Sequence, residues 1–327
     1  MALGIGISGP RGGGGGATPS LSIGVYSDAG YTIPVASLTY GATAYIKLVS
    51  ANITPTTHTF FFGNGTKNAP QVTQAGDSLA WVVSLTGTVT ISATATQGTT
   101  ATADATPFTL TSTIVITNSL KFDGVNDTTL ATPLIVRNQD FSVSFWFKMN
   151  SASVTNSLFS MGIKYDSNRL ALTVFYNVNN ITVLSSGTGW NLNRNVAWAG
   201  DTNWHNMVVT NNNSTNLIEI FIDGASIGVP NWDALTADFD YLLLAYGFNY
   251  NYGAVNIADF NIHDSVLTSL QIAALQTVGA TSANSVQRWI FSEAVGTVSG
   301  SVTDIVNNQK ATLSKMTLPF GIVADAP

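Results

Sequence analysis

The sequence predicts an all-β protein made of two consecutive domains. Its 327 residues are 45% hydrophobic but only 9% charged, a balance that suits stable β-proteins with neutral polar surfaces and not disordered chains. Short runs of alternating apolar and polar residues recur along the chain, separated by turns that contain glycine or asparagine. The length exceeds what one ordinary small core needs and accommodates two β-domains.

The strongest strand signal is the run FSVSFWFK at residues 141–148. Successive side chains of a strand point to opposite faces. One face then holds Phe141, Val143, Phe145 and Phe147, and the other holds Ser142, Ser144, Trp146 and Lys148. We expect the aromatic face to lie in a core.

Composition and charge narrow the classes of function. The net charge is −6 and the pI about 4.8, so the chain lacks the basic surface that neutralises phosphates, and we expect no nucleic-acid partner. There is no cysteine, which excludes disulfides and thiolate metal ligands. The opening residues lack the pattern of a secretory signal, and no apolar run reaches the roughly 20 residues of a membrane span. We therefore expect synthesis in a cytoplasm without export by the usual route.

A glycine-rich arm is expected at residues 1–19. Its tip is mildly apolar, and a Gly-Pro-Arg triplet leads into the glycine run 12–16. Glycine adopts positive φ and lets the backbone pass through narrow gaps between subunits. We expect this arm to dock against other subunits of an assembly, and the protein to be a homo-oligomer.

Residues 20–113 are expected to form a small β-sandwich. Alternation is clear at 21–25 and 44–48, and a Phe-rich run at 59–62 ends in a Gly-Asn-Gly turn signal. Trp81 is interpreted as a core aromatic. With about seven short strands, the segment resembles the PKD or Ig-like modules of surface and virion proteins, which implies an Ig-like sandwich.

Residues 117–327 carry the motifs of a second β-domain. The turn-rich segment FDGVND at 122–127 leads into the strand described above. Further motifs are DTNWHNMVVT at 201–210, LIEIFIDG at 217–224, GAVNIADFNI at 253–262 and RWIFSEAVG at 288–296. The Asp-Gly pair at 223–224 predicts a tight hairpin turn. In this set and spacing, residues of about 118–320 resemble laminin G-like, concanavalin A-like domains. The resemblance implies a jelly-roll β-sandwich with one short helix.

The motif around Trp289 comes last here, whereas it comes first in many members of that family. A strand that opens the domain in relatives would then close it in this chain. We expect this closing strand to return and pair beside the opening one.

The short helix implied by the resemblance has start signals of its own. Thr268 is the predicted N-cap and Gln271 its partner in a capping box, while Leu267 can pack on Ile272. Gly279 is the predicted stop.

The carboxylates give little support for hydrolysis. A glycosidase needs two closely placed carboxyl groups, and the chain has only two glutamates, Glu219 and Glu293, on different predicted strands. His205 belongs to a Trp-His strand motif and is interpreted as a hydrogen-bonded structural residue. The chain contains no Gly-x-Ser-x-Gly, phosphate-loop or His-Glu-x-x-His motif. We expect no catalytic residues and no enzyme activity.

Calcium is left open as a cofactor. The resemblance implies a rim site built from Asp carboxylates and backbone carbonyls, the oxygen ligands that Ca²⁺ prefers. Asp123, Asp127 and Asp259 stand in or near the matching loops. The alternative is that Asp123 and Asp127 cap the turn that starts the domain.

An aromatic–amide loop is the candidate glycan-binding site. Its residues are Tyr246, Phe248, Asn249, Tyr250, Asn251 and Tyr252, and Trp190 opens a second such loop that runs to Trp198 and could lie on the same rim. Aromatic faces stack on sugar C–H groups, and amides bond to sugar hydroxyls. The same residue types occur in subunit interfaces and in core strands, and these alternatives stay open.

The combination of features resembles that of bacteriophage virion proteins. These features are the missing export signal, the missing cysteine and the Thr/Asn-rich β-modules behind a glycine-rich arm. The first hypothesis is a non-enzymatic virion protein, a capsid decoration, head fibre or tail subunit, that displays a lectin-like domain to host surface glycans. A bacterial cell-surface adhesin or lectin is the second hypothesis, and a polysaccharide-cleaving enzyme is the third. No membrane insertion is expected.

Overall fold

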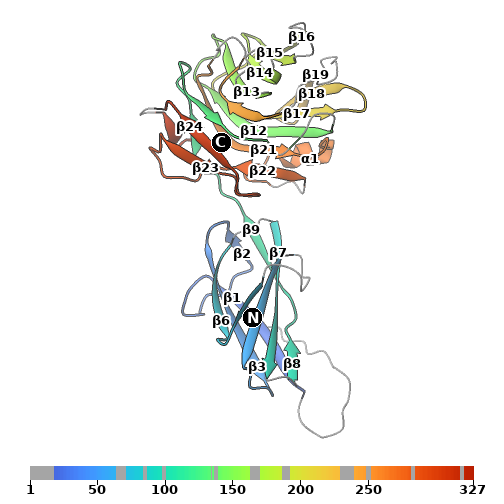
Figure 1. The fold of residues 1–327 in the computed structure, drawn as a ribbon, viewed down its shortest axis with the longest axis vertical. Helices are drawn as coiled ribbons and strands as arrows, with labels where there is room; N and C mark the ends of the chain where they lie inside the picture. Colours follow the sequence, from blue (N-terminus) through green and yellow to red (C-terminus); the bar gives the residue numbers. More distant parts are fainter. Residues whose placement is uncertain are drawn as a thin grey trace. The chain divides into compact units, whose positions relative to one another are not determined.

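A computed structural model of the chain describes residues 18–63, 71–83, 87–97, 101–133, 135, 139–162, 170–185, 192–228, 239–247, 252–280, 284–316 and 320–327 (Figure 1). The chain divides into two compact units, Met1–Val115 and Ile116–Pro327. The predicted docking arm lies outside the described residues except for Thr18 and Pro19. In the part of the chain that is described, no helix has the length and apolar character needed to cross a membrane.

The first unit is a sandwich of two antiparallel sheets. Its strands are β1 (Ser20–Tyr26), β2 (Ser37–Thr39), β3 (Thr43–Ala51), β4 (Thr57–Gly63), β5 (Gln71–Gln74), β6 (Ser78–Val82), β7 (Gly87–Gln97), β8 (Ala101–Asp104) and β9 (Phe108–Thr113). One sheet has the order β1-β3-β6, and the other has the order β2-β9-β7-β4-β5 with β8 beside β7. The pair β2–β9 is parallel, an exception within these sheets.

The sandwich core follows the predicted alternation. Ala44, Ile46 and Leu48 of β3 are buried, while their neighbours on the strand are partly exposed. Trp81 packs against this core and stacks on Phe62, with ring centroids 4.5 Å apart. As interpreted, Trp81 is a packing aromatic of this core, although it is only partly buried. Kinship with Ig-like modules stays a prediction.

The described residues of the second unit form three sheets and one helix. Its strands are β10 (Ser119–Lys121), β11 (Thr128–Leu130), β12 (Phe141–Met149), β13 (Asn156–Gly162), β14 (Leu170–Tyr176), β15 (Asn180–Ser185), β16 (Leu192–Ala197), β17 (Trp204–Asn212), β18 (Leu217–Ile222), β19 (Ala225–Gly228), β20 (Tyr241–Leu244), β21 (Val255–His263), β22 (Ser285–Trp289), β23 (Gly300–Thr303), β24 (Lys310–Ser314) and β25 (Gly321–Val323), and α1 spans Ser269–Ala274. An eight-stranded sheet runs β19-β18-β17-β12-β21-β10-β25, with β22 also beside β21. A five-stranded sheet runs β16-β15-β14-β13-β20, and β11-β24-β23 form the third sheet.

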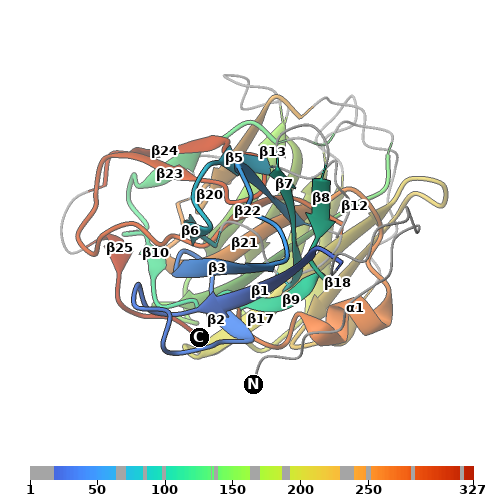
Figure 2. The same ribbon diagram turned by 90° about the horizontal axis from the view of Figure 1, so that it is seen from below.

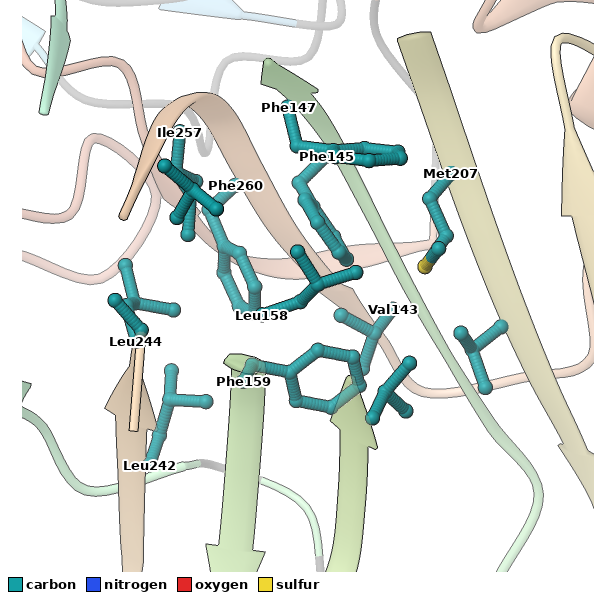
Figure 3. Packing of buried hydrophobic residues seen from close by; sticks show 14 of the residues in the cluster. Val143, Phe145, Phe147, Leu158, Phe159, Met207, Leu242, Leu244, Ile257 and Phe260 are labelled. Carbon is teal, nitrogen blue, oxygen red and sulfur yellow. The ribbon is translucent and has the colours of Figure 1, made fainter. Parts of the chain in front are cut away.

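The main core lies between the eight-stranded and five-stranded sheets (Figure 3). Phe145 of β12 contacts Phe159 of β13, with ring centroids 5.6 Å apart, and stacks on Phe260 of β21 at 5.3 Å. The predicted aromatic face of β12 is therefore in the core, as expected. All-β architecture with a jelly-roll sandwich is confirmed.

The opposite face of β12 is also covered at its first half, which alternation alone did not predict. Ser142 and Ser144 are buried there. The hydroxyl of Ser142 donates to the carbonyl of Ser265 at 2.8 Å and accepts from the backbone N–H of Leu267 at 3.1 Å. The segment that leads into α1 therefore lies across this face.

Helix α1 confirms its predicted start. Thr268 caps it, and Gln271 completes the capping box. Leu267 and Ile272 pack in one cluster with Val208 of β17. The predicted stop is wrong: the helix ends at Ala274 with its C-cap in the right-handed region, and Gly279, with φ +79°, belongs to the turn that follows.

The closing of the eight-stranded sheet differs from the prediction. The Trp289 strand, β22, pairs with β21 and not with β10, because β10 and β22 occupy different halves of the same edge of β21. The strand that returns to the opening one is β25, in which Ile322 pairs with Leu120 (Figure 2).

Candidate functional site

The base of the predicted glycan loop is built from two tyrosines that follow β20. Tyr246 and Tyr252 form an isolated β-bridge, and their rings meet edge to face with centroids 5.2 Å apart and planes at 67°. Both side chains are partly exposed. Ala245, which precedes them, has φ +54°, an unfavourable conformation for a residue with a Cβ. Two aromatic rings are thus held together at the surface of the five-stranded sheet.

Two glycines let this loop lie close on β13. A Cβ at Gly253 would overlap the carbonyl oxygen of Ser157, and a Cβ at Gly247 would lie 2.6 Å from the Ser157 hydroxyl. The hydroxyl of Ser160 donates to the Tyr246 carbonyl at 2.9 Å. The loop base is therefore fixed at several points.

Two buried hydroxyls beneath the loop have no hydrogen-bond partner among the described residues. They are those of Ser157 on β13 and Thr173 on β14, and the Thr173 methyl group would lie 3.1 Å from a Cβ at Gly247. A buried polar group without a partner costs free energy. Together with the left-handed Ala245, these features make the loop base locally unfavourable, and such sites cluster where function requires a particular surface.

The neighbouring strands add further polar groups to the same sheet. The hydroxyl of Thr182 on β15 donates to the side-chain oxygen of Asn195 on β16 at 2.7 Å. Thr173 and Phe175 alternate with the core residues of β14, so their side chains lie on the face of the sheet opposite the core. This face therefore carries hydroxyl, amide and aromatic groups.

Most of the predicted glycan residues lie outside the described part of the structure. These are Phe248, Asn249, Tyr250, Asn251 and Trp190. The prediction for the second loop is wrong at Trp198, the residue that ends it. Trp198 packs against the core and meets Tyr176 edge to face, with ring centroids 5.8 Å apart. Trp198 is therefore a packing residue and does not join a rim of exposed aromatics.

The proposed calcium ligands have other roles in the described structure. The Oδ1 of Asp123 accepts from the backbone N–H of Val125 at 2.7 Å, and the Oδ2 of Asp127 accepts from the Asp123 N–H at 3.0 Å. The two residues thus cap their own turn, as in the alternative interpretation. Asp259 instead pairs with Arg288. Among the residues that the structure describes, no group of three histidine or carboxylate side chains could hold a metal ion.

Asp127 is nonetheless an unusual carboxyl group. It is 1% exposed, and its Oδ1 has no partner in the described structure. Burial raises its pKa from 3.8 to about 6, and the charge of Asp123 adds to this, while the hydrogen bond from the Asp123 backbone opposes it. The buried turn therefore favours a protonated acid.

His205 lies between two carboxylates. Its Nδ1 is 2.7 Å from Asp223 Oδ2, and its Nε2 is 2.9 Å from Asp201 Oδ1. Asp223 and Gly224 have φ +49° and +76°, which form the tight turn predicted between β18 and β19. Burial lowers the pKa of His205, but the hydrogen bonds to Asp223 and Asp201 outweigh burial and raise the pKa above 6.5. His205 thus has the hydrogen-bonded structural role that the sequence predicted, with a charge that depends on pH.

Ser144 and His263 form a buried pair that no local sequence pattern predicts. Ser144 Oγ and His263 Nε2 are 2.9 Å apart, and the residues are 1% and 0% exposed. Burial and the nearby charge of Arg288 lower the pKa of His263 to about 3, and its Nδ1 has no partner in the described structure. The pair joins β12 to β21. Because both side chains are shielded from solvent, we interpret this contact as structural.

Comparisons with known proteins agree with this architecture. Residues 122–273 match a family model described as the concanavalin A-like lectin/glucanases superfamily. Among solved structures, a "putative carbohydrate binding protein" from Bacteroides ovatus matches with a TM-score of 0.50 and 12% identity, over 89% of this chain and 96% of that one. No curated protein sequence matches the chain.

Two further solved structures match about half of this chain. A heptameric SAP-like pentraxin from Limulus polyphemus has a TM-score of 0.42 and 10% identity, over 50% of this chain and 82% of that one. The binding domain of botulinum neurotoxin serotype D has a TM-score of 0.38 and 16% identity, over 49% of this chain and 42% of that one. At these identities the likeness concerns the fold alone. The strand motifs, the jelly-roll sheets and the family match together place residues 122–273 in a domain of the concanavalin A-like lectin/glucanase superfamily.

Proposed function

We propose that the protein binds glycans without cleaving them, through the sheet face at the Tyr246–Tyr252 loop base. The observation that carries this proposal is the partly exposed edge-to-face pair of Tyr246 and Tyr252, held over β13 by close glycine contacts. Sugar C–H groups favour aromatic faces, and adjacent hydroxyl and amide groups supply hydrogen bonds. The lectin-like fold and the description of the Bacteroides ovatus neighbour support the same ligand class.

Binding without cleavage is supported by the positions of the two glutamates. Glu219 accepts a hydrogen bond from the hydroxyl of Ser226 at 2.6 Å, and Glu293 accepts one from the backbone N–H of Thr303 at 3.0 Å. Each is engaged in its own hairpin or turn. A glycosidase mechanism needs two carboxyl groups that face one bond.

A position in a bacteriophage virion is the wider setting that we propose for this binding. It rests on the sequence: the glycine-rich arm, the missing cysteine and the low charge of both units. In this setting the arm docks the subunit and the lectin-like domain faces host glycans. Mass spectrometry of purified particles tests it, since recovery of the chain only from bacterial surfaces would favour the adhesin hypothesis.

The glycan proposal is tested by Tyr246→Ala and Tyr252→Ala on a glycan array. Each change removes one ring and should weaken binding by about 1 kcal/mol, several-fold in affinity. The first unit offers a matched control, because Tyr26 and Tyr31 form the same edge-to-face pair, with centroids 5.6 Å apart and planes at 87°. Tyr31→Ala should leave glycan binding unchanged.

Two outcomes would contradict the proposal. One is equal binding by all variants, and the other is altered oligomer size with unchanged glycan binding, which would make the loop a subunit interface. Turnover of a polysaccharide panel by the unchanged chain would contradict the non-enzymatic part alone.

A further inference from the structure

Three hydrogen-bond donors form one row across the eight-stranded sheet, whereas the loop base of Tyr246 and Tyr252 lies on the five-stranded sheet. They belong to three adjacent strands: Trp204 on β17, Lys148 on β12 and Asn256 on β21. In the strand register, Lys148 lies directly opposite Trp204 on one side and Asn256 on the other. Side chains of directly opposed residues lie on one face at close spacing. The sheet thus presents an indole N–H, an ammonium group and an amide together.

All three donors converge on a single carboxylate, that of Asp325. Its Oδ1 accepts from the Trp204 Nε1 at 3.2 Å, and its Oδ2 accepts from the Asn256 Nδ2 at 3.0 Å. The Lys148 ammonium lies 3.1 Å from Oδ2 and 3.4 Å from Oδ1. The row is therefore a complete carboxylate-binding arrangement, with both oxygens engaged.

The residue that occupies this arrangement comes from the short segment after β25. Asp325 lies two residues beyond Val323, and within the described part of the structure the hydrogen bonds of residues 324–327 all end on its carboxylate. The side chains of Lys148 and Asp325 are 33% and 38% exposed. Solvent therefore reaches the site, and a partly exposed ion pair contributes little stability. Such a contact can be displaced.

Asp325 also leaves one polar group of the site unsatisfied. Asn256 is 2% exposed, and its Oδ1 has no hydrogen-bond partner in the described structure. A carboxylate cannot satisfy this acceptor, because it has no hydrogen to donate. A ligand that brings a hydroxyl beside its carboxylate would satisfy the acceptor as well as the three donors.

We propose that the Trp204–Lys148–Asn256 row binds the carboxylate of an acidic sugar, a uronic or sialic acid, and that Asp325 occupies the row as a displaceable internal ligand. The carboxylate takes the place of Asp325, an adjacent sugar hydroxyl donates to Asn256, and the partly exposed Trp204 ring offers an apolar face. The sugar class rests on the proposed glycan function. The residues are distinct from Tyr246 and Tyr252, so the two sites fail separately.

The test uses the full chain and its Asp325→Ala variant, titrated with sodium glucuronate. Binding is followed by NMR on the indole N–H of Trp204, assigned through Trp204→Phe. If Asp325 fills the site about 90% of the time, its removal lowers the apparent Kd about tenfold. Lys148→Gln in the Asp325→Ala background should abolish the response.

Glucose and acetate are the matched probes. Glucose lacks the carboxylate and should give no shift, while acetate lacks the hydroxyls and should bind more weakly than glucuronate. Equal responses to acetate and glucuronate would overturn the sugar assignment. Tyr246→Ala and Tyr252→Ala should leave the glucuronate response unchanged, so that failure of the tyrosine site does not affect this result.

A folded Asp325→Ala variant that shows no glucuronate response would overturn the proposal. If that variant does not fold, Asp325→Asn is used in its place, since it removes the charge with little change in shape. Unfolding of both variants would also overturn the proposal, because the fold would then require the Asp325 carboxylate and no ligand could replace it.

Discussion

The carboxylate of Asp259 accepts two hydrogen bonds from the guanidinium of Arg288, at 2.6 Å from Nε and 2.7 Å from Nη2. Both side chains are almost fully buried. Asp259 sits at a β-bulge of β21, where two residues oppose one residue of β12, and its φ is +49°. The bulge changes the direction of the strand and allows a buried bidentate pair to join β21 to β22.

Removal of one partner of this pair should be costly. In Arg288→Met the carboxylate of Asp259 stays buried without its counter-charge, so the free energy of unfolding of the second unit should fall by about 3–5 kcal/mol. Urea denaturation followed by tryptophan fluorescence measures this. The control is Lys47→Met, which breaks the half-exposed Lys47–Asp77 pair of the first unit and should lower the free energy of unfolding far less, because solvent screens this pair. Similar losses in the two variants would refute the prediction.

His205 should make stability depend on pH near neutrality. Its folded pKa is raised, so the stabilisation from the two carboxylates is complete below about pH 6.5 and is lost as the pH rises through the folded pKa. The thermal midpoint should decline over that range in the unchanged chain and stay flatter in His205→Gln. Asp223→Asn should bring the NMR titration of His205 to lower pH, and an unmoved titration would show that the contact with Asp223 does not set the charge.

Asp127 should also make stability fall with rising pH, but over a lower pH range than His205. The folded chain keeps a proton on Asp127 up to about pH 6, whereas the unfolded chain releases it near the ordinary value of 3.8. Stability should therefore fall as the pH rises from about 4 to about 6. Asp127→Asn should remove this decline and unfold at higher urea than the unchanged chain at pH 7. Identical pH profiles for the two proteins would exclude a raised pKa at this carboxyl group.

The tyrosine loop should depend on the missing side chain of Gly253. In Gly253→Ala the new methyl group would overlap the Ser157 carbonyl, and neither backbone can yield easily. Overpacking of this kind costs about 1–3 kcal/mol, and glycan binding should fall with it. Gly76→Ala is the control, since its Cβ would lie 3.7 Å from the Gln74 side chain, an ordinary contact. If both variants melt and bind like the unchanged chain, the close approach has no role.

Local sequence patterns predict a structural feature correctly when the residues that form it lie within a few positions of one another. The capping box of Thr268 and Gln271 and the Asp223–Gly224 turn depend only on chain neighbours, and both were predicted correctly. The aromatic face of β12 was predicted because alternation has a fixed period of two. The burial of Ser142 was missed, because the segment that covers it is distant in sequence.

Features that depend on strand register could not be predicted. The Asp259–Arg288 pair requires a bulge, and the Asp325 site requires three strands in one alignment; neither has a local sequence signal. For the candidate site, the residue types in the loop from Trp190 to Trp198 predict exposed aromatic side chains on a rim of the domain. Alternation along and just beyond β16 instead directs Val196 and Trp198 toward the core, and only the sheet register determines which face that is.

The place of β10 between β21 and β25 has a consequence for synthesis. Leu120 emerges from the ribosome early in the second unit, but it pairs with Ile257 and Ile322, which emerge much later. Until then both edges of β10 lack partners and can pair with other nascent chains. Contacts between residues so distant in sequence also slow folding. Completion of the jelly roll must therefore wait for translation of β25, and chaperone protection should matter most during that interval.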